Sequence, residues 1–392
     1  MPHSYPADPA DPLAAVTHAA PYAYYRRLAA GPPLRFDATL DCWLATGAAG
    51  VQAVLAHADC RVRPPGHTVP PYLAGTPCAT LFAELVRMNE GERHAVPKQV
   101  LAAALGRVDL ARLQQRTRHI AREHLPASPA RLNDALFALP LFAMADVLGF
   151  APAQWPALAA WTRDFVACLS PLSTASQLAG AQLAAAALLQ RFAALLQEGA
   201  AWPGSLLASI VSEAQTQGWH ASGALLANLV GLLSQTCEAT AGLLGNAIVA
   251  LQTQPGLSAQ LRAAPRLWPA MLREASRHDP SIHNTRRHTA CAVEIDGVTV
   301  PQGQMIVVVL ASACHDASVH ADPGRFVLQR PLAQLASFGH GRHACPGVAM
   351  AQAIAAAGAR VWADVPQAMP LGWTYQASQN ARIPVFFQGE TA

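Results

Sequence analysis

The sequence predicts a mainly α-helical fold with small β regions, formed by a single domain over residues 1–392. Three observations point to this class. Apolar residues recur at helical spacing over most of the chain, and alanine, the strongest helix former, supplies much of the 52% hydrophobic content. Alternating patterns typical of strands gather in a late segment and near the C-terminus. Neither an internal repeat nor a low-complexity linker divides the sequence.

The helical segments follow one another through the first two thirds of the chain. A strand over Cys42–Thr46 and a short helix over Ala48–Ala58 come first, and the proline- and glycine-rich stretch Arg63–Pro77 is expected to be a loop. Further helices are expected over Ala79–Asn89, Val100–Leu105, Leu110–His124, Leu132–Leu148, Pro152–Leu169, Ala175–Gly199, Gly204–Gln217 and about Ser222–Gln252.

The β signals come after the longest helix. Segment Ala292–Leu310 alternates in polarity, turns at Asp296-Gly297, and then runs apolar, which predicts a hairpin followed by a buried strand. Arg382–Phe387 reads as a final strand. The β content is therefore expected to be small and to lie beside a larger helical body.

Composition excludes several classes of protein. The net charge is +3 and no lysine-rich tract occurs, so nothing indicates nucleic-acid binding. No run of about 18 uninterrupted, strongly apolar residues predicts a membrane span, and the N-terminal residues do not resemble a secretion signal. The eight cysteines are scattered without a CxxC pair, which argues against a disulfide framework or a zinc ribbon. We therefore expect a cytoplasmic protein.

Cys345 lies where a loop leads into the alanine-rich helix that follows Gly347. A thiol at a helix N-terminus faces free backbone N–H groups and the positive end of the helix dipole, which predicts a lowered thiol pKa. Glycines at positions 339, 341 and 347 would let a flat group approach the backbone. Arg342 and His343 are candidates to hold carboxylates. A thiolate, a planar partner and carboxylate anchors together describe a haem with an axial cysteine.

The pattern Phe-Gly-x-Gly-x-His-x-Cys-x-Gly is matched without a gap, at six of ten positions between Phe338 and Gly347. This segment resembles the haem-binding loop of the cytochrome P450 family. The resemblance implies haem b (iron protoporphyrin IX) as cofactor, with Cys345 as the iron ligand. It also implies cofactor-binding roles for Phe338, His343 and Gly347. Without the rest of this pattern, a buried free cysteine would be the simpler interpretation.

Other segments are similar to the same family. Glu274 and Arg277 match its Glu-x-x-Arg helix pair, although such a pair is also common on helix surfaces. The resemblance places Arg287 on a haem propionate, a task that suits the planar guanidinium. His94 matches the family's His-x-x-x-Arg helix, but Lys98 replaces the arginine and would offer a single point charge. Pro97 makes the start of that helix uncertain.

The long helix carries the family's oxygen-side motif in altered form, in the stretch from Leu232 to Asn246. Glu238 occupies the position of the acid, Ala239 stands where the family has a threonine, and Thr240 follows. Gln235 and Thr236 replace two small residues; they either face the substrate or bond backbone carbonyls and bend the helix. Oxygen activation at a haem needs protons, which an acid and an alcohol can relay through water. We expect Glu238, Thr240 and Thr236 to serve as this catalytic set, although Glu238 as a capped structural carboxylate stays open.

Substrate contacts are expected from two places. Gln235 and Ala239 would face the substrate from the long helix, and Ile282, His283 and Asn284 would do so from the loop after the Glu-x-x-Arg helix, unless they are ordinary loop residues. Their mixed polarity favours a medium-sized, partly polar metabolite over a simple fatty acid.

The electrons would come from outside the chain. No GxGxxG fingerprint for a flavin or nicotinamide occurs, so the resemblance implies that NAD(P)H delivers electrons through a reductase and a ferredoxin or flavodoxin. Positive charges on the cysteine side would suit an acidic carrier.

The leading hypothesis is therefore a haem-thiolate monooxygenase that oxidises a small organic substrate, as in secondary metabolism. With Ala239 in place, a peroxide-driven or non-hydroxylating oxidase (desaturation, ring closure or coupling) is the first alternative. A haem protein that binds or senses without catalysis is the second.

Overall fold

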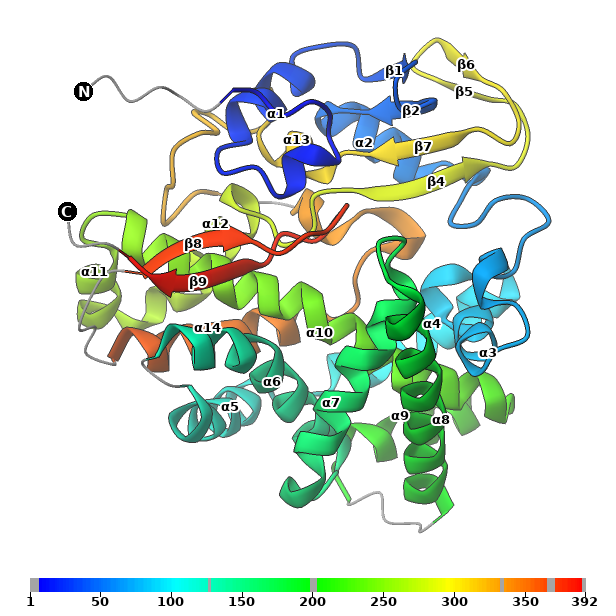
Figure 1. Cartoon of the computed structure of the whole chain (residues 1–392), viewed down its shortest axis with the longest axis vertical. Coiled ribbons are helices and arrows are strands. Elements are labelled where there is room, and N and C mark those ends of the chain that lie inside the picture. The colour runs from blue at the N-terminus through cyan, green and yellow to red at the C-terminus, as the bar shows by residue number, and fades with distance from the viewer. Residues whose placement is uncertain (1–6, 126–127, 198–202, 332–334, 365–370, 390–392) are drawn as a thin grey trace.

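The computed structural model describes residues 7–125, 128–197, 203–331, 335–364 and 371–389. Most of the described chain is helical. The main sheet lies at one side with three helices around it, and the remaining helices form a larger body beside it (Figure 1). The mainly α prediction with small β regions is confirmed.

The helices have the following bounds: α1 Tyr22–Ala29, α2 Gly47–Ala56, α3 Pro77–Glu84, α4 Glu92–Gly106, α5 Leu110–His124, α6 Pro129–Leu148, α7 Trp155–Val166, α8 Ala175–Gln197, α9 Leu206–Thr216, α10 Ser222–Thr253, α11 Leu257–Ala263, α12 Trp268–His278, α13 Leu310–Cys314 and α14 Val348–Asp364. Two short 3-10 helices that matter for the site are Val86–Met88 and Ala167–Leu169.

The strands are β1 Leu34–Asp37, β2 Cys42–Ala45, β3 Cys60–Arg61, β4 Thr285–Thr289, β5 Val293–Ile295, β6 Val298–Val300, β7 Met305–Val308, β8 Leu371–Tyr375 and β9 Pro384–Gln388. The main sheet has the order β1-β2-β7-β4-β3, in which only β2 and β7 are parallel. β5–β6 and β8–β9 are separate antiparallel hairpins.

Helix α10 runs through the middle of the helical body and packs against α6 and α14 (Figure 1). Its sequence is apolar on nearly all sides, as expected for a helix surrounded by protein. Two glycines permit close packing of the C-terminal segment. A Cβ atom on Gly242 would lie 2.8 Å from the carbonyl oxygen of Arg382, and one on Gly245 would lie 2.8 Å from Cδ of Pro384. These glycines therefore bring the last strand up to the central helix.

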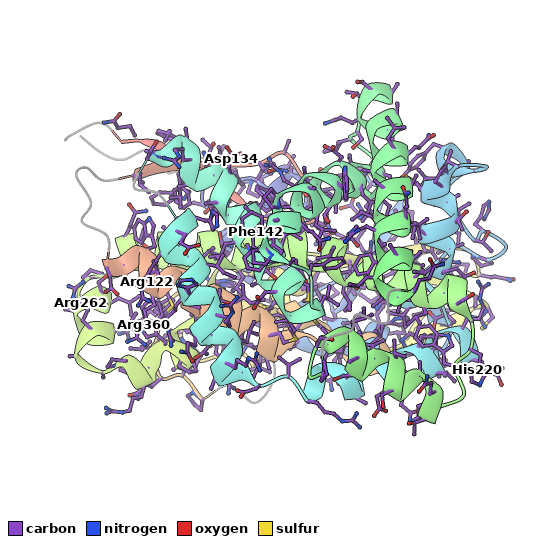
Figure 2. The ribbon with its side chains drawn as sticks, turned by 90° about the horizontal axis from the view of Figure 1, so that it is seen from below. Arg122, Asp134, Phe142, His220, Arg262 and Arg360 are labelled. Carbon is purple, nitrogen blue, oxygen red and sulfur yellow. The ribbon has the colours of Figure 1, made fainter. Side chains whose placement is uncertain are left out.

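Aromatic rings pack inside the helical body, and most charged side chains lie at its surface. Figure 2 shows Phe142 inside this layer, whereas Arg122 and Arg262 lie towards the outside. The Phe142 ring lies 5.9 Å from that of Trp155 and 5.0 Å from that of His124, measured between ring centroids. Such offset contacts add to the free energy gained from apolar burial.

Most helix predictions agree with the structure to within a few residues. The expected helix over Leu110–His124 and the long helix from Ser222 are found with nearly the same bounds. The prediction over Ala79–Asn89 was too long, because its second half turns into a 3-10 helix after Glu84. Pro97 lies inside α4, which begins earlier than expected, at Glu92. Residues 198–199, with which another predicted helix ended, lie outside the described part of the chain.

One described helix passes a length and composition test for crossing a membrane, contrary to our expectation that none would. This helix, α8, is 23 residues long with a mean hydropathy of 1.4. It also packs against α7 and buries one alanine-rich face, so that a third of the apolar window is inside the protein. Because the core helix of a soluble protein passes the same test, this result is only weak evidence that α8 spans a membrane.

The pair Glu274–Arg277 is the most completely buried ion pair among the described residues. Two hydrogen bonds of 2.7 and 2.9 Å join the guanidinium to the carboxylate. The remaining donors of Arg277 reach the carbonyl oxygens of Cys314, Pro323 and Arg325. The pair thus fastens α12 to the long segment that precedes the cysteine loop.

We predict that Glu274→Gln lowers the free energy of unfolding by about 3 kcal/mol, because it leaves the buried Arg277 charge without its counter-ion. Urea unfolding at neutral pH would measure this. The matched control is Asp322→Asn, in an i,i+3 pair with Arg325 that is 3.9 Å long and mostly exposed; it should cost less than about 0.5 kcal/mol. Equal losses in the two variants would contradict the prediction.

Candidate active site

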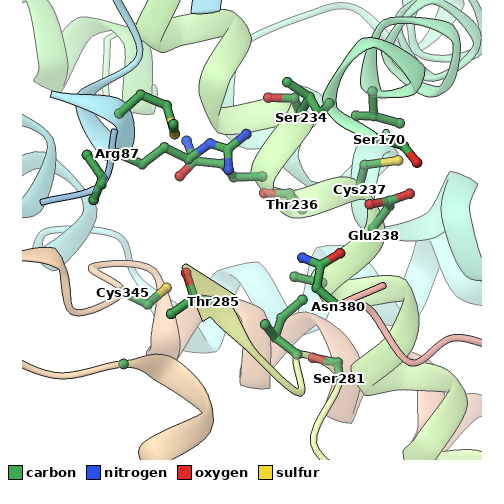
Figure 3. Close-up of a pocket in the computed structure, with 18 of the residues that line it drawn as sticks. Arg87, Ser170, Ser234, Thr236, Cys237, Glu238, Ser281, Thr285, Cys345 and Asn380 are labelled. Atoms are coloured by element: carbon green, nitrogen blue, oxygen red, sulfur yellow. The ribbon is translucent and has the colours of Figure 1, made fainter. Parts of the chain in front are cut away.

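A cavity of about 1460 Å³ lies between α10, the cysteine loop and the start of β4 (Figure 3). Pockets that hold one drug-sized ligand usually measure roughly 300–1,000 Å³. The cavity therefore has room for a large cofactor and a second molecule together.

Cys345 lies in the cysteine loop, which forms one wall of this cavity. Gly339 and Gly341 adopt φ angles of 76° and 66°, a left-handed conformation that favours glycine, and so turn the loop back on itself. The Cys345 backbone N–H then donates to the carbonyl oxygen of Phe338 over 2.9 Å. The side chain borders the interior cavity, and its sulfur faces that space in Figure 3. The loop thus presents a thiol to an interior space.

The expected lowering of the Cys345 pKa is wrong for the structure as described. Burial raises the pKa of this thiol, and this effect outweighs the opposing ones of the Gly347 N–H and the Lys98 charge. The following helix α14 begins only at Val348, three residues after the cysteine. The N-terminus of α14 therefore lowers the pKa of the Cys345 thiol less than the sequence suggested.

Arg342 does not point into the cavity as a carboxylate holder. Its guanidinium donates to the carbonyl oxygens of His57, Ala58 and Cys60, and its Nε lies 2.9 Å from the Glu90 carboxylate. Burial by itself raises the pKa of Glu90, but hydrogen bonds from His343 and Arg342 outweigh it and bring the pKa down to about 2. Arg342 therefore anchors the loop to the segment after α2.

Basic side chains gather at one edge of the cavity near the cysteine loop. His94, Lys98, Arg287 and His343 all line it. The rings of His94 and His343 are 4.2 Å apart, and Lys98 donates to the carbonyl oxygen of Ala344. Burial lowers the pKa of His94 to about 4, with the charges of His343 and Lys98 adding to the effect. The structure thus brings these four predicted residues together.

Arg287 has a buried donor without a partner. Its Nη1 donates to the carbonyl oxygen of Arg286 over 2.8 Å, but its buried Nε makes no hydrogen bond to the part of the chain the structure describes. Burial lowers the pKa of Arg287 to about 10, against the raising effect of Glu90. A buried unsatisfied donor at a cavity wall indicates a place for an acceptor from a ligand.

The predicted oxygen-side residues line the opposite wall, on α10. Gln235 donates to the Gly231 carbonyl oxygen over 2.9 Å, and Thr236 donates to that of Leu232 over 2.7 Å. This is the carbonyl-bonding alternative considered for both residues, and it occupies the Thr236 hydroxyl proton. Ala239 and the buried Thr240 also line the cavity.

Glu238 faces the cavity without a hydrogen bond or ion pair to any described residue (Figure 3). Burial raises the pKa of this carboxyl, against the lowering effect of the Arg87 charge. A carboxyl of this kind holds its proton more readily than an exposed one.

The three substrate candidates after α12 separate onto two faces. Ile282 and Asn284 line the cavity, whereas His283 points away from the cavity and is not part of its lining. The His283 Nδ1 atom is 2.8 Å from the Tyr25 hydroxyl, and its ring is fully buried. Side chains alternate along an extended segment, so neighbours of a cavity residue point away from it. The structure thus corrects the expectation for His283.

Arg87 is a cavity residue that sequence analysis missed. It lies in the 3-10 helix Val86–Met88, before α4, and its side chain enters the cavity in Figure 3. A charged residue within the stretch "LVRM", next to residues that are apolar and buried, was the available signal.

Comparisons with known proteins agree with this geometry. A family model described as Cytochrome P450 matches residues 249–356. Cytochrome P450 107B1 of Saccharopolyspora erythraea is 30% identical over 223 residues, which cover 56% of this chain and 53% of that protein. Linalool 8-monooxygenase of Pseudomonas putida is 30% identical over 272 residues, 66% of this chain and 65% of that one. The matches thus span between about half and two thirds of these two relatives.

Solved structures share the whole fold. CalO2 superimposes with a TM-score of 0.83 at 23% identity, over 96% of this chain and 97% of that one. The epothilone B-bound cytochrome P450epoK gives 0.83 at 18% identity, over 93% and 94%. The fold is that of these structures, and in it a cysteine faces a large cavity opposite the central helix, the arrangement that a haem-thiolate protein requires. The chain belongs to the cytochrome P450 family.

Membership of this family implies a haem, and the described residues fit one. The cavity is large enough, and the Cys345 thiol faces it. The unsatisfied Nε–H of Arg287 and the neighbouring basic side chains can donate hydrogen bonds to carboxylates. Soft thiolate and paired basic side chains are the donors such a group requires.

We predict that Arg287→Leu weakens haem retention roughly 10-fold, the effect expected from the loss of one charge-assisted hydrogen bond. Transfer of haem to apomyoglobin would measure this. The control is Arg286→Leu, since Arg286 also lines the cavity but donates to the Gln379 side chain. If both variants lose haem at the wild-type rate, Arg287 has no such role.

Proposed function

We propose that the protein is a haem-thiolate monooxygenase that uses dioxygen to hydroxylate or otherwise oxidise a small organic substrate. One observation carries the proposal. The Cys345 sulfur and the Glu238 carboxyl face the same cavity from the loop and from α10, and the whole cavity, at about 1460 Å³, exceeds an ordinary ligand pocket. The similarity to linalool 8-monooxygenase, a monooxygenase by name, supports the same activity.

Cys345 would hold the haem iron, and Arg287, His94, Lys98 and His343 would hold its carboxylates. When bound, the group supplies the chemistry of oxygen activation. The chain itself fixes the ligand geometry, because Cys345 N–H donates to Phe338 and Lys98 donates to the Ala344 carbonyl oxygen. These contacts would keep the sulfur in place during turnover.

Glu238 would act as the local proton donor. Its carboxyl lines the cavity, has no partner among the described side chains, and has a pKa raised by burial. Since Ala239 has no hydroxyl and Thr236 donates to a backbone carbonyl, the next alcohol along the helix is Thr240. The proton would therefore pass from Glu238 through water, with Thr240 as the second group.

The substrate class, electron source and location are parts of the same proposal. The cavity lining is mixed in polarity, which suits a partly polar secondary metabolite, and P450epoK, a structure of the same fold, holds epothilone B. Electrons would come from NAD(P)H through a reductase and a ferredoxin or flavodoxin. The protein would work in the cytoplasm.

Ala239 favours a second candidate function. Without the neighbouring alcohol, proton delivery depends on Glu238 alone or on a substrate hydroxyl, and a reaction driven by peroxide needs fewer delivered protons because the peroxide carries its own. The same candidate includes oxidations without oxygen insertion. Product analysis with peroxide and without a reductase would separate this candidate from the monooxygenase.

We predict that Cys345→Ser abolishes the long-wavelength Soret band of the reduced, carbon-monoxide-treated protein, because that band requires a thiolate ligand. The matched control is Cys237→Ser, a buried cysteine that also lines the cavity but on α10. An unchanged band in the Cys345 variant, or a purified protein that binds no haem, would sink the proposed function.

We also predict that Glu238→Gln slows substrate-dependent oxygen consumption by about 10²-fold, the usual effect of losing a positioned proton donor. A surrogate ferredoxin system and any metabolite that shifts the Soret band suffice for the measurement. Thr236→Val is the control and should change the rate little, because its hydroxyl already donates to Leu232. A rate loss equal in both variants would contradict the proton-donor role.

A further inference from the structure

Arg87 stands apart from the other arginines that line the cavity. Arg63 donates to the carbonyl oxygens of Phe82 and Ala83, and Arg163 lies 3.4 Å from the Asp134 carboxylate. Arg286 and Arg287, described above, also donate to protein oxygens. Arg87 makes neither a hydrogen bond nor an ion pair to any residue that the structure describes. Its guanidinium is therefore available to a ligand.

The position of Arg87 separates it from the basic group near the cysteine loop. In Figure 3 its side chain extends from the 3-10 helix Val86–Met88 towards Thr236 on α10, while Cys345 and Thr285 lie on the other side of the open space. The four basic residues proposed to hold haem carboxylates cluster instead around the cysteine loop. Arg87 thus belongs to the side of the cavity that faces α10.

No described side chain neutralises Arg87. Against the lowering effect of burial, the Cys168 thiol and the Glu238 carboxyl raise the pKa of Arg87, but no ion pair within 4.0 Å joins Arg87 to Glu238. Burial lowers the pKa of Arg87 and raises that of Glu238, as expected when two groups share a poorly hydrated space without contact. Arginine nevertheless stays charged in proteins. A buried guanidinium whose Nε has no acceptor costs stability, and an anionic ligand would remove that cost.

The surroundings of Arg87 indicate the rest of the ligand. Apolar side chains form part of the cavity lining, among them Phe82 and Val86, close to Arg87 in the chain, and Leu232 and Leu243 on α10. A planar guanidinium recognises a carboxylate through two parallel hydrogen bonds. The combination suits a molecule with an apolar body and one carboxylate.

We propose that Arg87 binds the carboxylate of the substrate, so that the enzyme acts on an organic acid whose apolar body lies along the wall near α10. This inference rests on the proposed haem function, because it assigns the acid to the same cavity as the haem. Arg87 would then determine substrate specificity. It would hold the carboxylate at one end of the substrate and so position the remote end for oxidation.

The test uses the haem-loaded protein and a matched set of iron-binding probes. ω-(Imidazol-1-yl)alkanoic acids and the corresponding ω-(imidazol-1-yl)alkanols differ only in the terminal group, and both shift the Soret band when the imidazole binds iron. Titration gives a Kd for each chain length without knowledge of the substrate. Wild-type protein should prefer one or two acid lengths over the alcohols by about 10- to 100-fold, as a charge-assisted pair predicts.

Variants then assign the preference to Arg87. Arg87→Met should remove the acid preference and leave alcohol binding unchanged, and Arg87→Lys should retain part of it, because the charge stays while the paired geometry is lost. Arg163→Met is the matched control, an arginine of the same cavity that already has Asp134 as a partner, and it should keep the wild-type preference.

Three outcomes would overturn the proposal. The first is equal binding of acids and alcohols by the wild-type protein at every chain length. The second is an acid preference that persists in Arg87→Met. The third is faster haem release from Arg87→Met with an unchanged acid preference, which would assign Arg87 to the cofactor. The carbon monoxide spectrum keeps these failures distinct from that of the proposed function, since each of them leaves the thiolate band of the wild type in place.

Discussion

The fastening of the cysteine loop is the constraint on which the site depends. A thiol can face a large interior cavity only if the loop that carries it is held from behind. Arg342 provides much of this support, because its guanidinium donates to the carbonyl oxygens of His57, Ala58 and Cys60 and pairs with Glu90. One side chain thus joins the loop to the sheet region and to the segment before α4, and holds together both regions that enclose the cavity.

Two buried arginines away from the cavity have their charges paired, and the contrast makes the unpaired groups at the cavity informative. Glu274 and Arg277 saturate each other and several carbonyl groups, and Arg382 pairs with Asp279 over 2.8 Å while also bonding backbone oxygens near the N-terminus. Both networks join segments far apart in the sequence. Arg87 and Glu238, by contrast, have no hydrogen bond or ion pair to a described residue, and both face the cavity. An unsatisfied polar group at a cavity wall marks a place where a ligand can bind.

The sequence predicted the elements whose signal is local. The long helix α10 was found from its pattern of apolar residues, and the cysteine loop from its resemblance to the haem-binding loop of a known family. The face of each side chain was harder to predict, because it depends on pairing with distant segments. Ile282 pairs with Ala381, and the His283 N–H donates to Asn380, which turns the His283 ring towards Tyr25 and away from the cavity. The role of Arg87 was missed for the same reason: only the packed structure shows that no neighbour accepts its hydrogen bonds.

The two unpaired ionisable groups that face the cavity, Arg87 and Glu238, restrict its ligands by exclusion as well as by attraction. A neutral, wholly apolar molecule placed beside Arg87 would displace water from the guanidinium and offer no hydrogen-bond acceptor in return, which costs free energy. A molecule with an acceptor at the right distance avoids that cost. Selectivity of this kind is large because the wrong ligand leaves a buried polar group unpaired. The same reasoning applies to Glu238, whose carboxyl can donate its proton to a water or a substrate hydroxyl only if the ligand leaves it accessible. The unpaired charges therefore restrict both the chemical class of the substrate and the way in which it lies in the cavity.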